Sequence, residues 1–299
     1  MLLGERAPIL STAHPSPLRV LVIDCHTHLN RYSPDEPPSV VERYMRLREQ
    51  MEAHGVDYAL VLSSYKVTPE RPSTRELLEL VQDEPRIGVV AGMCHASERA
   101  AELAELRSLL EEGRLKGLKL YPGYESFSIH ELGLRELYAL AGRFGVPVMI
   151  HTGDTYAPGS RVRYAHPLAV DDLAVEFPEV TFVLCHLGSP WFVDAMEVLY
   201  KNANVVADIS GLTLGSFEPR FERFALDRLN EVLAWLNDPS KLLFGSDWPL
   251  SDIASYLRFV SRLEATPEER EGLLWRNAAR VFRLELEGGG GPRADDGTA

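Results

Sequence analysis

The sequence predicts an α/β fold in which eight parallel strands, each followed by a helix, close into a single (β/α)8 TIM barrel. Short apolar runs alternate with longer amphipathic stretches along the chain. The length of 299 residues suits one barrel of about 250 residues with short extensions. Histidine and aspartate side chains directly follow several of the apolar runs, which is where the functional residues of such barrels lie.

The predicted strands are short runs rich in apolar and β-branched residues. They are Arg19–Cys25, Asp57–Leu62, Arg86–Cys94, Gly117–Tyr121, Val146–His151, Val180–His186, Asn204–Ile209 and Lys241–Gly245. The predicted helices are Ser39–His54, Thr74–Gln82, Ser97–Glu112, Leu132–Phe144, Leu168–Glu176, Trp191–Lys201, Arg220–Asn237 and Ile253–Leu263. Gly55, Gly113 and Gly145 follow helical runs, where a left-handed residue commonly ends a helix.

An open, doubly wound sheet would use the same alternation of strands and helices. The closed barrel is favoured because candidate metal ligands follow the first, fifth, sixth and eighth predicted strands. These side chains can meet only if the first and last strands are neighbours. An open sheet would hold those two strands too far apart.

The two ends of the chain have a different composition from the centre. Residues 1–17 contain three prolines and predict an extended N-terminal arm. Residues 18–286 form the predicted barrel domain, which ends with a helix near Pro267–Arg283. Residues 287–299 are glycine-rich and contain too little apolar surface to order themselves, so we expect a flexible tail.

The charge balance excludes some classes of partner. Asp and Glu total 44 against 31 Lys and Arg, which gives a net charge of −13. An acidic surface repels phosphate groups, so we expect neither nucleic acid nor an anionic membrane as partner. No run of about 18 apolar residues and no signal-like segment are present, and we expect a cytoplasmic protein.

The three cysteines, Cys25, Cys94 and Cys185, form neither a CxxC motif nor an even-numbered framework. A disulfide scaffold is therefore not expected, which fits a reducing compartment. Cys25 and Cys185 each precede a candidate metal ligand by one residue. On a regular strand neighbouring side chains point to opposite faces, so both thiols are predicted to face the helices.

The strongest functional signal is a set of potential metal ligands at strand ends. His26 and His28 lie two residues apart, so their side chains leave the same face of a strand with roots about 6.5 Å apart. That spacing lets two imidazoles reach one ion. His151, His186 and Asp247 end three further apolar runs. A set of hydrogen-bonded core groups would not explain why all five gather at one rim, so we predict a metal site.

Several of these segments resemble the sequence landmarks of the amidohydrolase superfamily. They are IDCHTH at 23–28, GLKLYP at 117–122, IHTG at 150–153, LCHLG at 184–188, FGSDWP at 244–249 and RNAARVF at 276–282. The order and spacing are most similar to the amidohydrolase-related branch that includes aminocarboxymuconate-semialdehyde decarboxylase. The resemblance spans residues 19 to 284 and is specific for the superfamily rather than for a substrate.

The resemblance implies that His26, His28, His151 and Asp247 bind one divalent ion, most often zinc. Three imidazoles and one carboxylate suit Zn²⁺, with Mn²⁺ or Fe²⁺ as alternatives. Asp247 would also act as general base toward a metal-activated water. His186 would orient that water or polarise the substrate carbonyl.

Lys119 lies on the fourth predicted strand and has three possible roles. As a plain lysine it could hold a substrate carboxylate. As a carboxylated lysine, which some superfamily members carry, it could bridge the first ion to a second one. It could also be structural, with its stem buried. A count of metal ions per chain distinguishes the second role from the others.

The remaining candidate substrate-binding residues lie just past strand ends. Tyr121 and Trp248 are placed to form pocket walls, and Arg161 in the loop after the fifth strand could bind an acid. Loop packing is an equal alternative for the two aromatic residues, and a solvated surface charge is the alternative for Arg161. Together with Lys119 they suggest a small substrate that bears a carboxylate.

The leading functional hypothesis is metal-dependent hydrolysis of a small C–N or C–O substrate, such as an amide, a lactone or a cyclic ester. The alternative is a non-oxidative decarboxylase of an aromatic or unsaturated acid that uses the same ion. A nuclease of the TatD type, which shares the HxH opening, is disfavoured by Lys119 and by the acidic charge. A non-enzymatic barrel with a structural ion would need a coordination shell closed by protein ligands. Barrels of this branch are often dimers, and a homodimer is possible.

Overall fold

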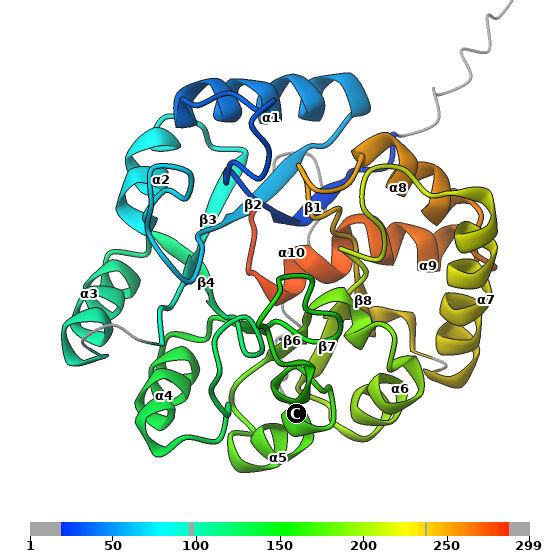
Figure 1. Cartoon of the computed structure of the whole chain (residues 1–299). Coiled ribbons are helices and arrows are strands. Elements are labelled where there is room, and N and C mark those ends of the chain that lie inside the picture. Colours follow the sequence, from blue (N-terminus) through cyan, green and yellow to red (C-terminus); the bar gives the residue numbers. More distant parts are fainter. Residues whose placement is uncertain (1–18, 96–98, 237, 287–299) are drawn as a thin grey trace, which may run out of the picture.

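The computed structural model describes residues 19–95, 99–236 and 238–286, and it shows the predicted barrel (Figure 1). Eight parallel strands pair in chain order from β1 to β8. They are β1 (Ile23–Thr27), β2 (Tyr58–Leu62), β3 (Ile87–Gly92), β4 (Leu115–Leu120), β5 (Val148–Ile150), β6 (Phe182–Leu184), β7 (Val205–Asp208) and β8 (Leu242–Leu243). The predicted α/β barrel class is confirmed. The predicted arm at 1–17 and tail at 287–299 lie outside the described residues.

Most of the helices surround the strands (Figure 1). They are α1 (Val40–His54), α2 (Thr74–Leu80), α3 (Arg99–Glu111), α4 (Arg135–Phe144), α5 (Ala169–Glu176), α6 (Phe192–Lys201), α7 (Pro219–Leu236), α8 (Ile253–Ser261), α9 (Pro267–Glu271) and α10 (Asn277–Val281). The single final helix that the sequence predicts is divided by a π-helical turn, Gly272–Arg276. Among the described residues, no helix combines the length and the apolar character that crossing a membrane requires.

Apolar side chains pack in two layers. The larger core lies between the strands and the outer helices, and includes Val61, Leu120 and Phe244. The smaller core fills the barrel interior and includes Ile23 and Leu60. The interior core also includes α10 residues Ala278, Val281 and Phe282. In Figure 1, α10 lies across the centre of the ring of strands. Its apolar residues pack into the interior core and close the end of the barrel opposite the carboxyl ends of the strands.

The barrel closes between β1 and the residues that follow β8. The backbone N–H of Cys25 donates to the carbonyl of Phe244 at 3.0 Å. The N–H of Asp247 donates to the carbonyl of His26 at 2.8 Å, and the N–H of His28 donates to the carbonyl of Trp248 at 2.7 Å. The first and last parts of the barrel are therefore joined by backbone hydrogen bonds at the level of the candidate ligands.

The predicted orientation of two cysteines is wrong. Cys25 and Cys185 both belong to the interior core rather than to the helix-facing one. In β1 the pairing with β2 shifts register between Asp24 and Thr27, so β1 contains one extra residue there. Such a bulge breaks the alternation of faces. Cys25 thus points into the barrel although His26, its neighbour, also reaches the interior side.

A different cause applies to Cys185. Regular β6 ends at Leu184, and Val183 already faces the interior, so Cys185 follows it two residues later on the same face. His186 is not a strand residue at all. It lies in a tight turn over Cys185–Gly188, where its backbone has φ 61° and ψ 22°. The turn, rather than strand alternation, directs the imidazole toward the barrel mouth.

Candidate metal centre

Three candidate ligands meet at the carboxyl ends of the first and last strands. One ligand atom each from His26, His28 and Asp247 lies within 4.8 Å of the others. Asp247 Oδ1 is 3.7 Å from His26 Nε2 and 3.4 Å from His28 Nε2. All three residues are buried, with at most 7% of the residue exposed. A single ion could bind to all three with small adjustments of the side chains.

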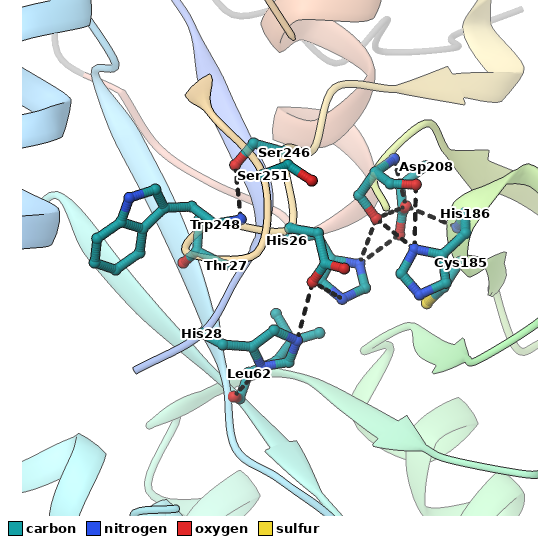
Figure 2. Close-up of polar contacts among 12 residues, drawn as sticks. His26, Thr27, His28, Leu62, Cys185, His186, Asp208, Ser246, Trp248 and Ser251 are labelled. Carbon is teal, nitrogen blue, oxygen red and sulfur yellow. Dashed lines mark hydrogen bonds and ion pairs between the residues drawn. The ribbon is translucent and has the colours of Figure 1, made fainter. Parts of the chain in front are cut away.

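Hydrogen bonds fix which nitrogen of each imidazole is available. His26 Nδ1–H donates to Asp208 Oδ2 at 3.0 Å, and His28 Nδ1–H donates to the carbonyl of Leu62 at 2.9 Å (Figure 2). Both Nε2 atoms are then unprotonated acceptors, and both face Asp247. This carboxylate–histidine and carbonyl–histidine arrangement is the usual support of metal-binding histidines. The donor set therefore fits a divalent ion.

Asp208, at the end of β7, is a residue of this site that the sequence analysis missed. It is fully buried, and besides the bond from His26 it accepts the backbone N–H groups of His186 at 3.0 Å and Ser210 at 3.1 Å. Burial alone would raise the pKa of Asp208, but the electrostatic interaction with the His26 ring and the hydrogen bond from it outweigh burial and hold that pKa well below its usual value. The available signal was an aspartate that ends the apolar run Val205–Ala207.

His186 lies on the other side of His26, with ring centroids 4.9 Å apart. Its Nδ1–H donates to Ser210, whose carbonyl oxygen is 3.2 Å away and whose Oγ is 2.9 Å away. His186 Nε2 is thus left as an acceptor. His26, His186 and Asp208 form a second group of ligand-type atoms within 4.8 Å of one another.

His151 does not join either of these groups in the described part of the chain. Its ring centroid is 5.0 Å from that of His186 and 4.7 Å from that of Tyr124. His151 Nε2–H donates to the carbonyl of Asp154 at 3.0 Å, so Nδ1 is its unprotonated nitrogen. The structure therefore brings His26, His28 and Asp247 together, and it places His151, the fourth expected ligand, beside His186.

The protonation states suit metal binding. Burial lowers the pKa of His26 to about 4 and also lowers the pKa values of His151 and His186, so these rings are neutral near pH 7. Burial by itself would raise the pKa of Asp247. The interactions with the neighbouring imidazoles of His28, His26 and His186 outweigh that effect, and the pKa of Asp247 lies well below its usual value. Asp247 is therefore a carboxylate.

Two site residues have unusual backbone conformations. His186 has φ 61° and Asp247 has φ 65°. Non-glycine residues rarely adopt this left-handed region, and each instance costs on the order of 1–2 kcal/mol. Such conformations cluster at functional sites, where surrounding structure maintains them.

The candidate substrate-binding residues lie at different depths. Lys119 is only 1% exposed, and its Nζ donates to Cys185 Sγ inside the barrel at 2.5 Å. Tyr121 is buried, and its hydroxyl donates to the carbonyl of Ser63. Trp248 packs against the helix-facing core, and its indole extends away from His186 in Figure 2. Arg161 is exposed on the loop after β5.

Comparison with known proteins gives the family. The sequence matches the amidohydrolase family over residues 23–284, which is most of the chain. The chain therefore belongs to the amidohydrolase family of enzymes, as the sequence landmarks predict. A search of curated proteins found no match.

Several solved structures share the fold. An uncharacterised TIM-barrel protein from Bordetella bronchiseptica is 21% identical with a TM-score of 0.69, covering 88% of this chain and 99% of that one. A putative 2-pyrone-4,6-dicarboxylic acid hydrolase from Pseudomonas putida is 21% identical with a TM-score of 0.64, covering 90% and 100%. A dihydroxybenzoic acid decarboxylase from Polaromonas, with bound manganese and the inhibitor 2-nitroresorcinol, is 15% identical with a TM-score of 0.64, covering 89% and 98%.

Proposed function

We propose that this amidohydrolase is a metal-dependent hydrolase that cleaves a C–N or C–O bond in a small amide, lactone or cyclic ester. The observation that carries the proposal is the position of Asp247. Its carboxylate faces the Nε2 atoms of His26 and His28, and it is ionised and buried. A single carboxylate can there serve both as ligand and as base. The hydrolase of Pseudomonas putida with the same fold is consistent with this choice.

Each residue of the centre would have a distinct role in the reaction. His26, His28 and Asp247 would hold the ion, and His151 would complete the ligand set through Nδ1. When bound, a divalent ion makes a nearby water more acidic and polarises a carbonyl group. Asp247 would accept a proton from the attacking water and return it to the leaving group. His186 would orient the water or the substrate carbonyl through its free Nε2.

Zinc is the ion we propose, because neutral imidazoles and a carboxylate suit it. Mn²⁺ and Fe²⁺ are the alternatives, and the related decarboxylase from Polaromonas contains manganese. A second ion would require carboxylated Lys119, whose Nζ would then have to leave Cys185. A metal content near two ions per chain would support that alternative.

The proposed substrate is a small molecule that bears a carboxylate, bound by the set Lys119, Tyr121, Trp248 and Arg161 that the sequence suggests. The proposal includes a cytoplasmic setting, since the three cysteines form no disulfide with one another. No nucleic acid or membrane partner is proposed because of the net charge of −13. A homodimer is part of the proposal and is testable by light scattering.

Asp247→Asn is the decisive variant. It keeps the shape of the side chain and one ligand oxygen but removes the base. We expect the variant to retain its metal and to lose about 10²–10⁴-fold in kcat on any lactone or amide that the wild type hydrolyses. Full activity in a metal-loaded Asp247→Asn protein would contradict the general-base role.

The second candidate function is non-oxidative decarboxylation, which the fold shared with dihydroxybenzoate decarboxylase supports. The two candidates differ in their products. Carbon dioxide release from aromatic or unsaturated acids, without hydrolysis of lactones or amides, would replace the hydrolase proposal by this one.

A further inference from the structure

The loop between β2 and α2 places an arginine next to the barrel mouth. The guanidinium carbon of Arg71 lies 5.6 Å from the centre of the Tyr32 ring and 5.3 Å from that of Tyr65. Arg71 Nη1 donates to Ser64 Oγ at 2.7 Å. In the described ranges this half-buried guanidinium forms no salt bridge with an aspartate or glutamate, and it contacts the Tyr32 and Tyr65 rings and the Ser64 hydroxyl, with Lys66 against the same Tyr65 ring. The charge is therefore available for an anion that comes from outside the protein.

One tyrosine connects Arg71 to the metal centre. The Tyr32 ring lies edge-on to His28, with centroids 6.3 Å apart. Burial raises the pKa of Tyr32, the negative charge of Asp247 raises it further, and the positive charge of Arg71 lowers it. The Tyr32 phenol is thus within electrostatic range of both groups. A short substrate could reach Arg71 with one end and the candidate ligands with the other.

Tyr65 and a further tyrosine, Tyr124, form a flat aromatic wall between Arg71 and His151. The rings of Tyr65 and Tyr124 are stacked, with centroids 5.9 Å apart and planes at 15°. Tyr124 in turn meets the ring of His151 at 4.7 Å. Aromatic side chains therefore run from the guanidinium of Arg71 to the histidines. Such a surface fits a planar substrate better than a branched one.

The loop holds Arg71 in place before any ligand binds. The backbone of Arg71 exchanges two hydrogen bonds with Thr68, at 2.9 Å and 3.1 Å, and the carbonyl of Glu70 accepts the N–H of Arg31 at 2.7 Å. A fixed guanidinium loses little freedom on binding an anion and can form two parallel hydrogen bonds to a carboxylate. Lys119 is less accessible to a substrate carboxylate than Arg71, since it is 1% exposed and its Nζ is hydrogen-bonded to Cys185.

We propose that Arg71 anchors a carboxylate of a planar substrate, while Tyr65 and Tyr124 contact its flat face. This inference rests on the proposed function, because it assigns the far end of the same substrate. It makes Arg71 a specificity-determining residue outside the ligand set, and it adds Arg71 to Lys119 and Arg161 as a source of charge complementarity.

The test uses isophthalate as a planar dicarboxylate probe and isophthalamide as its uncharged counterpart. Titration calorimetry on the zinc-loaded full chain gives the dissociation constant of each. Arg71→Met removes the charge and keeps much of the apolar stem, whereas Arg71→Lys keeps the charge without the planar fork. Arg75→Met is the matched control, since Arg75 lies four residues further on and is exposed and paired with Glu105.

We expect Arg71→Met to weaken isophthalate binding by about 10- to 100-fold, as for loss of a charge-assisted hydrogen bond. Arg71→Lys should fall between Arg71→Met and the wild type, and Arg75→Met should change binding by less than about twofold, as usual for exposed pairs. Isophthalamide affinity should not depend on Arg71. Zinc content and thermal unfolding, measured on the same samples, show whether each variant is folded and loaded.

Two results would overturn the anchor. One is equal isophthalate affinity in folded wild-type and Arg71→Met proteins, and the other is a wild type that binds isophthalate no better than isophthalamide. Either result leaves the proposed function intact if Asp247→Asn still abolishes turnover. A chain without bound metal would instead count against the proposed function, and isophthalate titration of that metal-free protein would still test Arg71.

Discussion

At the level of single residues, the centre depends on hydrogen bonds as much as on the ligands. The sequence identified His26, His28 and Asp247 because each ends an apolar run. Asp208 ends such a run too, but its role depends on a bond between β7 and β1 that no spacing in the chain reveals. Sequence reasoning thus found three groups of the candidate ion site and missed the carboxylate that accepts the hydrogen bond of His26.

Asp208→Asn tests this support. The amide keeps the volume of the side chain but removes the negative charge that accepts the His26 proton. We expect zinc affinity to fall by about 10- to 100-fold, as for other partners of metal-binding histidines. Competition with a zinc chelator measures the zinc affinity of the variant and of the wild type. Asp227→Asn makes the same chemical change on the exposed face of α7 and should leave the affinity unchanged. Equal zinc affinities in the two variants would show that Asp208 does not support metal binding.

At the level of elements, the sequence predicted the order of strands and helices better than the direction of side chains. The β1 bulge and the turn after β6 both reverse the face expected from regular alternation, and both lie beside candidate ligands. A pattern of period two cannot reveal an extra residue or a left-handed turn. The predicted existence of eight strands is confirmed, whereas the orientation of Cys25 and Cys185 required coordinates.

The turn after β7 allows a matched comparison of two glycines. Gly211 and Gly215 have φ 61° and 65°, so alanine is strained at both, by about 1–2 kcal/mol. Only at Gly211 would a Cβ collide, since it would lie 2.4 Å from His186 Nδ1 and 3.0 Å from Asp247 Oδ2. A Cβ at Gly215 meets nothing within 4 Å.

We therefore expect Gly211→Ala to lower both the free energy of unfolding and the zinc affinity. Gly215→Ala should lower only the free energy of unfolding. Urea unfolding and chelator competition separate the two effects. Similar zinc affinities in both alanine variants would show that the His186 ring can move aside without consequence.

For the whole molecule, the closed barrel is what makes the site possible. The sequence supported closure because the first and eighth strands had to share a centre, and backbone bonds between β1 and the residues after β8 confirm it. The family assignment covers the same region. The substrate could not be predicted in the same way, because the loops that carry Arg71 and Tyr124 have no periodic pattern to interpret.

Metal removal should affect the stability of the whole fold. A ligand that binds only the folded state stabilises it by about 4 kcal/mol when its free concentration is 1,000 times Kd. We expect chelation to lower the melting temperature of the wild type. His28→Ala should show almost no response to chelator, and His54→Ala on α1 should respond as the wild type does. An unchanged melting temperature in the chelated wild type would argue against a tightly bound ion.

The seam between β1 and the residues after β8 has a consequence for biosynthesis. His26 and His28 leave the ribosome early, whereas Asp247 emerges only after nearly the entire barrel has been made. A nascent chain therefore cannot assemble the full coordination shell, however much zinc surrounds it. We expect ion binding to be among the last events of maturation, and the bound ion would then connect the first strand of the barrel to the residues that follow the last one.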